Sequence, residues 1–265
     1  MCPTDKPISE PRGSSTVVLV RDTEASPEIL LVLRHAKSAF GASYVFPGGV
    51  LEPVDEPTGT KCDMDDTAAS KVLDLQRGGG AYFSAAVREL FEEVGVLLAR
   101  TSGGQWADPC LYTQQRDALN NSSLLWTQFI ADNDLRPAFD ALHYFSFWVT
   151  PREIAKRFST RFFIAAMPAK QEAEHCGGEL TDSRWMPIAK ALAANKAGEI
   201  DIPHPTVLTL KTLGEFDSAS SMLAWAAQRS EAGVPCYLPA IISVDGQQQV
   251  VMPDSPHYPT YPAEQ

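Results

Sequence analysis

The stretch RELFEEVGV, residues 88–96, carries three glutamates within five positions, set among aliphatic and aromatic residues. At about 100° of turn per residue, a helix over 82–94 would have one apolar face, made of Val87, Leu90, Phe91 and Val94. The opposite face would carry the three carboxylates, Glu89, Glu92 and Glu93. Gly95 supplies the usual stop at the C-terminal end. We therefore predict an amphipathic helix whose acidic residues all point the same way.

Like charges spaced three and four residues apart repel each other by a few tenths of a kcal/mol in water. A bound divalent cation would offset this repulsion, and Mg²⁺ and Mn²⁺ prefer oxygen ligands of this kind. Arg88 stands four positions before Glu92 and can hold that carboxylate in place. The alternative is a solvated acidic face on an ordinary amphipathic helix. Taken alone, the helix leaves both interpretations open.

A glycine loop upstream favours the metal site. The segment YVFPGGVLEPVDE, residues 44–56, follows a short strand with two glycines and then adds three acidic residues. Together the two segments resemble the signature of the Nudix hydrolases, G-x5-E-x7-R-E-U-x-E-E-x-G-U, where U is aliphatic. Residues 88–96 match its second half at every specified position. The first half fits from Gly49, with Asp55 where the family has glutamate.

The two halves of the signature are separated by extra sequence. Normal spacing would put the arginine 14 positions after Gly49, at 63, but it stands at 88, so 25 residues interrupt the box. They correspond to the segment 56–80, which mixes turn residues and acids with a possible helix near 66–76. We predict that this segment is an insertion outside the core.

The resemblance extends over roughly residues 15–190. HYFSFWVTP (143–151), RFSTRFFIAAMP (157–168) and GGELTDSRWMP (177–187) are similar to the branch of Nudix hydrolases with an interrupted box, which includes acyl-CoA diphosphatases. The resemblance implies the α+β class and the Nudix fold, an α/β/α sandwich around a mixed β-sheet. The implied reaction is hydrolysis of a diphosphate linkage in a nucleoside diphosphate derivative, including CoA or acyl-CoA as candidates.

Carried over residue by residue, the resemblance implies the following roles. The metal ligands for Mg²⁺ or Mn²⁺ are Glu89, Glu92, Glu93 and Gly49, and Arg88 orients the carboxylates. The candidates for the general base are Glu89, Glu92, Glu174 and Glu179, of which Glu179 joins the helix residues among the catalytic candidates. The candidates for substrate binding are Arg34, Lys37, Gly48 and Arg161. For Arg34 and Lys37 the alternative is a solvated surface cation, and for Arg161 it is an ion pair with a surface acid.

Composition excludes several classes of function. The chain has 265 residues and a formal net charge of −11, without any run rich in Lys and Arg, so phosphate-driven binding of nucleic acid is not expected. Five scattered cysteines without a CxxC pair fit a reducing compartment. Without a membrane span or signal peptide in the pattern, we expect a cytoplasmic protein that acts on a small diphosphate substrate.

The chain is predicted to form one domain, residues 15–265, after a disordered leader, residues 1–14. Residues 191–265 are predicted as a C-terminal helical elaboration, whose apolar residues can pack in the core or form the surface of a homodimer. Within it, Asp245-Gly246 stands between two strand-like runs and predicts a hairpin. The alternative function is a non-catalytic Nudix-fold sensor that binds a nucleotide without cleaving it.

Overall fold

The computed structural model describes residues 8–35, 42–56, 62–176 and 180–260. Its centre is an eight-stranded mixed sheet, in which β1 pairs in parallel with β8 and antiparallel with β2 and β4. The strands of this sheet are β1 (Arg12–Arg21), β2 (Glu28–Arg34), β3 (Tyr44–Val45), β4 (Gly48–Val50), β7 (His143–Val149), β8 (Phe158–Ala166), β9 (Leu180–Pro187) and β10 (Cys236–Tyr237). Ser15 of β1 stands opposite Gly49 of β4, which places the glycine loop at the centre of the sheet.

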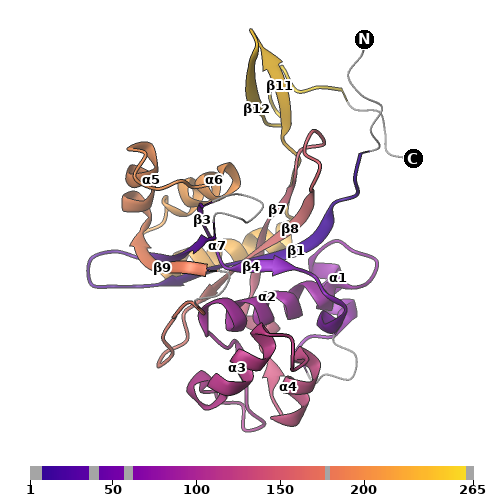
Figure 1. Ribbon diagram of the computed structural model, residues 1–265, viewed down its shortest axis with the longest axis vertical. Helices are drawn as coiled ribbons and strands as arrows, with labels where there is room; N and C mark the ends of the chain where they lie inside the picture. The colour runs from indigo at the N-terminus through magenta and orange to yellow at the C-terminus, as the bar shows by residue number, and fades with distance from the viewer. Residues whose placement is uncertain (1–7, 36–41, 57–61, 177–179, 261–265) are drawn as a thin grey trace.

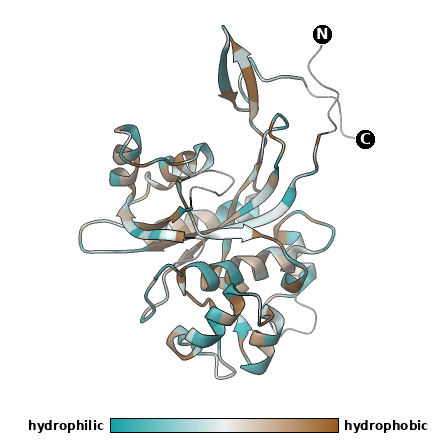
Figure 2. Ribbon diagram, in the orientation of Figure 1, coloured by the Kyte–Doolittle hydropathy of each residue, from teal (hydrophilic) through white to brown (hydrophobic). Residues whose placement is uncertain are grey.

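Helices cover both faces of the sheet (Figure 1). One layer holds α1 (Asp66–Val72), α2 (Gly79–Val94), α3 (Thr113–Asn120) and α4 (Trp126–Asp132). The other holds α5 (Ile188–Lys196), α6 (His204–Leu213) and α7 (Ala219–Ala232). Short 3-10 turns and strands complete the connections: η1 (Pro53–Asp55), β5 (Ala99–Arg100), η2 (Pro109–Tyr112), β6 (Arg136–Pro137) and η3 (Phe139–Ala141). Hydrophilic and hydrophobic residues alternate along these helices (Figure 2), as helices with one apolar face require.

Alternating side chains along each strand build one core on each face of the sheet. On β1, Val17 packs into the core under α2, and Val18 packs into the core under the C-terminal helices. All four apolar residues predicted for the inner face of α2 are fully buried. The predicted α/β/α sandwich around a mixed sheet is therefore confirmed.

The insertion is packed more deeply than predicted. Its helix α1 lies where the sequence suggests one, but Ala69 and Leu73 are fully buried in the core under α2. Asp66 also accepts hydrogen bonds from the backbone amides of Gly78 and Gly80, so α1 caps the N-terminal end of α2. The prediction that 56–80 lies outside the core is wrong for α1, because α1 supplies both apolar surface and a helix cap.

The ends of the domain also differ from expectation. β1 begins at Arg12, so residues 12–14 belong to the sheet and not to a leader. The predicted helical elaboration contains α6 and α7, but β10 then pairs with β7 of the main sheet. The predicted hairpin is confirmed as β11 (Ala240–Val244) and β12 (Gln247–Val251), with Asp245 and Gly246 at positive φ in its turn. It projects from the body of the molecule (Figure 1).

No helix within the described ranges combines the length and apolar character that crossing a membrane would need.

Candidate functional site

Arg88 and Asp55 join the two halves of the interrupted signature. The Arg88 guanidinium donates from Nε to Asp55 Oδ1 over 2.8 Å and from Nη2 to Asp55 Oδ2 over 2.9 Å. Both side chains are buried, with 4% and 0% of their surface exposed. Such a two-point contact fixes the carboxylate geometrically as well as electrostatically. Residues separated by the insertion therefore meet as one unit.

The same guanidinium holds two of the three helix carboxylates. Arg88 Nη1 donates to Glu89 Oε1 over 2.8 Å and lies 3.3 Å from Glu92 Oε2. Its Nη2 also donates to the carbonyl oxygen of Val50, at the end of the glycine loop. Arg88 is thus the centre of a network that ties α2 to β4 and η1. Arg88 contacts two of the carboxylates that it was predicted to orient, and the orienting role stays a prediction.

The third carboxylate is held by the glycine loop. Glu93 Oε2 accepts a hydrogen bond of 2.8 Å from the backbone N–H of Gly48, and Glu93 Oε1 lies 3.5 Å from Arg34 Nη2. Arg34 also donates to the carbonyl oxygen of Gly48. A side chain at Gly49 would begin 2.2 Å from Glu89 Oε1, so only glycine lets this carboxylate approach the loop. The loop and the acidic face are therefore in direct contact.

Burial dominates the electrostatics of the acidic face. The pKa of the Glu92 carboxyl is raised to about 7. The largest cause is loss of solvent, the charge of Glu89 adds to it, and the charge of Arg88 opposes it. Loss of solvent also raises the pKa of Glu89. Burial alone would lower the pKa of Arg88, but its bonds to Asp55 and the charges of Glu89 and Glu92 raise it. Burial therefore outweighs the charge of Arg88 at both Glu89 and Glu92.

These groups line a hollow of about 230 Å³. One side of it is charged, formed by Glu52, Arg88, Glu89, Glu92 and Glu93. The lining also includes apolar side chains, namely Leu119 of α3, Leu124 and Leu125 from the segment between α3 and α4, and Trp126 of α4. Asn120, Ser122, Val54 and Cys176 complete the lining. The acidic face of α2 therefore opens into a pocket of the size of a small ligand group.

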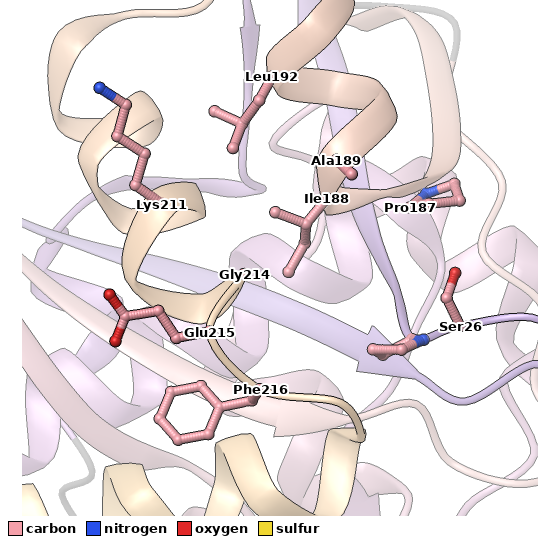
Figure 3. Close-up of a pocket in the computed structure, with 10 residues that line it drawn as sticks. Ser26, Pro187, Ile188, Ala189, Leu192, Lys211, Gly214, Glu215 and Phe216 are labelled. Atoms are coloured by element: carbon pink, nitrogen blue, oxygen red, sulfur yellow. The ribbon is translucent and has the colours of Figure 1, made fainter.

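A larger hollow, of about 330 Å³, lies on the other side of the sheet (Figure 3). Ile188 and Leu192 of α5 border it, together with Lys211 of α6 and Glu215. None of the predicted site residues lines it, and it holds one acid and one base rather than a cluster of carboxylates. The smaller hollow is therefore the candidate active site.

The other predicted residues lie apart from the pocket or outside the described ranges. Arg161 is buried on β8, where its guanidinium stacks on Phe147 at 3.5 Å and donates to Tyr144 Oη, so it does not line the pocket. Glu174 is exposed and is not part of the lining either. Lys37 and Glu179 fall outside the residues that the structure describes.

Sequence reasoning missed the far wall of the pocket. Arg116 and Asn120 of α3 both donate to the carbonyl oxygen of Glu92, near the C-terminal end of α2. Trp126 of α4 donates from Nε1 to Ser84 Oγ, also on α2. No pattern in the sequence indicated that this segment borders the carboxylates. Only the three-dimensional packing brings this segment to the site.

The donor set suits a hard divalent cation. Glu89, Glu92 and Glu93 offer carboxylate oxygens on one helix face, next to a glycine that leaves room for them. Burial raises the pKa of Glu89 and of Glu92, and a bound cation would favour their charged forms. Within the described ranges, no group of three or more Asp, Glu, His or Cys side chains is arranged so that it could hold a metal ion. Here the carboxylates are drawn instead to Arg88, Arg34 and the Gly48 amide.

Comparisons with known proteins agree with the geometry. The family model described as NUDT19 Nudix domain matches residues 77–213, which is 137 of the 265 residues. The acyl-coenzyme A diphosphatase NUDT19 of Xenopus laevis is 26% identical over 274 residues, covering 89% of this chain and 72% of that protein. The human protein of the same name is 28% identical over 187 residues, covering 66% of this chain and 50% of that protein.

A solved structure supports the same assignment. The crystal structure of a Nudix hydrolase from Alicyclobacillus acidocaldarius aligns with a TM-score of 0.65 at 25% identity, over 82% of this chain and 97% of that one. The resemblance predicted from the sequence is confirmed. The Arg88–Asp55 ion pair brings the two halves of the signature together. The chain belongs to the NUDT19 Nudix domain family and is a Nudix pyrophosphohydrolase.

Proposed function

We propose that this protein hydrolyses the diphosphate linkage of CoA or an acyl-CoA, with Mg²⁺ or Mn²⁺ held by the acidic face of α2. The observation that carries the proposal is the Arg88–Asp55 pair, because its guanidinium holds Glu89 and Glu92 at the pocket, next to Glu93 on the same helix. The choice of substrate rests on the names of the relatives from Xenopus laevis and human.

Glu89, Glu92 and Glu93 would hold the cation, with the loop at Gly49 next to them. When bound, a divalent cation neutralises diphosphate oxygens and favours attack of water at phosphorus. Water forms the new P–O bond as the bridging P–O bond breaks, which yields two phosphate monoesters. Of the described candidates for the general base, Glu89 and Glu92 line the pocket and Glu174 does not, so we assign the base to one of these two.

The remaining residues position the reacting groups. Arg88 keeps Glu89 and Glu92 in place through its bonds to both, and its own position is fixed by Asp55. Arg34 lies between Glu93 and the Gly48 carbonyl, with 26% of its side chain exposed, and can meet a phosphate oxygen from there. Arg161 has no part in this arrangement.

The test is a substrate panel with Mg²⁺ or Mn²⁺, with products identified by mass. The panel contains CoA, acyl-CoAs, NADH, ADP-ribose, dinucleoside polyphosphates and nucleoside triphosphates. We expect CoA or an acyl-CoA to be cleaved into adenosine 3′,5′-bisphosphate and phosphopantetheine or its acyl form, and Glu92→Gln to lower this turnover about 100-fold or more. If the protein prefers another diphosphate, the assignment of CoA or acyl-CoA as its substrate is wrong. Binding of a nucleotide without turnover would favour a non-catalytic sensor.

A further inference from the structure

The pocket beside the carboxylates has an unusual composition for an enzyme that acts on phosphates. Besides Glu89 and Glu92, its lining includes Leu124 and Leu125, from the segment between α3 and α4, and Trp126, the first residue of α4, which is 2% exposed. Leu125 is 55% exposed, which is high for a leucine. Exposed apolar side chains next to a polar site are typical of surfaces that bind a ligand.

This wall is fixed relative to the acidic face. Asn120 of α3 donates to the carbonyl oxygen of Glu92, and Trp126 donates to Ser84 of α2. Phe129 of α4 stacks on Phe91 of α2, with ring centroids 5.4 Å apart and planes 11° apart. Three separate contacts thus attach α3 and α4 to the helix that carries the carboxylates. A group bonded directly to the reacting diphosphate would reach this wall.

We infer that a wall made of Leu124 and Leu125, with the buried Trp126 behind them, binds the pantetheine arm of the substrate, and that it selects this arm over a sugar. The inference rests on the proposed function, because it assumes that the diphosphate lies at the α2 carboxylates. In CoA the second carbon after the diphosphate ester oxygen carries two methyl groups, whereas in ADP-ribose a hydroxyl-rich ring stands at that place. Methyl groups gain free energy on this wall, but sugar hydroxyls would lose water without finding a partner there.

The experiment compares dephospho-CoA with ADP-ribose, which share adenosine diphosphate and differ only in the arm. CoA itself is measured alongside. We expect the wild-type protein to prefer dephospho-CoA by kcat/KM. Leu125→Ser should reduce that preference by about 10-fold or more, mainly through KM for the pantetheine substrates, while ADP-ribose is unaffected. Leu125→Met, which keeps the apolar surface, should restore the preference.

The variants are chosen so that misfolding cannot imitate the result. Leu125 is the N-cap of α4, a position that serine favours, so Leu125→Ser should fold normally. The matched control is Leu111→Ser, which changes a 71% exposed leucine outside the pocket and should leave both substrates unchanged. An unaltered preference in Leu125→Ser, or equal losses on both substrates, would overturn the inference.

The failure of the proposed function gives a different pattern. If the wild-type protein cleaves no diphosphate, the proposed function fails, and the inference is then decided by calorimetric binding of the same two nucleotides. Tighter binding of dephospho-CoA that Leu125→Ser removes would uphold the wall as a pantetheine site. Equal binding of both nucleotides, or no binding of either, would overturn it.

Discussion

Arg88 and Asp55 lie 33 positions apart in the sequence, yet they form a buried ion pair with two hydrogen bonds of 2.8 and 2.9 Å. The insertion therefore lengthens the chain between the halves of the signature without separating their side chains. Asp55 has a shorter side chain than the glutamate that the family places there, and the 3-10 turn η1 brings it to Arg88. The function of the pair is to fix the guanidinium from which Glu89 and Glu92 are held.

Removing one member of this pair should destabilise the protein. Asp55→Asn leaves a buried guanidinium without its main counter-charge, and such losses cost about 3–5 kcal/mol. Urea unfolding would measure the change in the free energy of unfolding. The control is Asp74→Asn, at an exposed position of positive φ where asparagine is tolerated. Equal unfolding free energies in the two variants would show that the pair does not hold the site together.

Gly49→Ala should damage activity more than stability. The new Cβ would begin 2.2 Å from Glu89 Oε1, the end of a side chain that can move away. Turnover should fall about 100-fold, as on loss of one preorganised electrostatic group, with the free energy of unfolding changed by about 1 kcal/mol. Gly103→Ala is the control, since its Cβ meets only Thr101 Oγ1 at 3.7 Å. Similar turnover in both variants would contradict the close fit of loop and carboxylate.

The insertion should contribute to stability. Leu73→Ala removes a fully buried side chain from the core under α2, which costs about 2–5 kcal/mol. Asp66→Ala should cost about 0.5–2 kcal/mol, because two backbone amides before and within α2 lose their acceptor. Thermal unfolding and urea titration would measure both changes, with exposed Leu111→Ala as the control. If Leu73→Ala is as stable as this control, the insertion is a surface loop that does not contribute to the core.

The sequence predicts the acidic helix and its partner loop because both depend on local patterns. The spacing of Glu89, Glu92 and Glu93 against the apolar face of α2 follows from the helical period alone. The Asp245-Gly246 turn is similarly local, and both of its residues take the positive φ that such turns require. The two helices predicted over 82–94 and near 66–76 are accordingly found as α2, Gly79–Val94, and α1, Asp66–Val72.

What the sequence does not predict depends on contacts between distant segments. The polar composition of 56–80 conceals that Ala69 and Leu73 reach the core, since their apolar neighbours are interspersed with acids and turn residues. The position of Leu125 opposite the carboxylates depends on how α3 and α4 pack on α2. Arg161 was predicted near phosphate because of its charge, but its side chain points to Phe147 and Tyr144. Orientation and packing of this kind leave no periodic signal.

Neutralising the acidic face should remove metal binding and turnover together. Glu92→Gln and Glu93→Gln keep the shape of the side chain, so the metal-free protein should be equally stable or slightly more stable. Turnover should fall about 100-fold or more, in parallel with the affinity for Mn²⁺. Titration calorimetry and kcat would be measured on the same samples, with exposed Glu199→Gln as the control. If both site variants keep the wild-type affinity for Mn²⁺ and the wild-type kcat, the acidic face of α2 is not the catalytic centre.

The raised pKa of Glu92 predicts how stability depends on pH in the metal-free protein. Its ordinary pKa of 4.5 rises to about 7 on folding, chiefly through burial. Between these values the folded protein binds more protons than the unfolded chain, so the free energy of unfolding falls as pH rises. The stabilising contribution of the protonated carboxyl is complete below 4.5 and is lost above about 7.

Urea unfolding with a chelator, from about pH 5 to about pH 8, would measure this slope. Glu92→Gln cannot ionise and should flatten it, whereas Glu199→Gln should keep it. Because the cation competes with the proton, the affinity for Mg²⁺ should increase over the same range, and binding should release protons. Calorimetry in two buffers of different ionisation enthalpy would count them. If Glu92→Gln unfolds with the same pH slope as wild type, the protonated state of this carboxyl does not contribute to the fold.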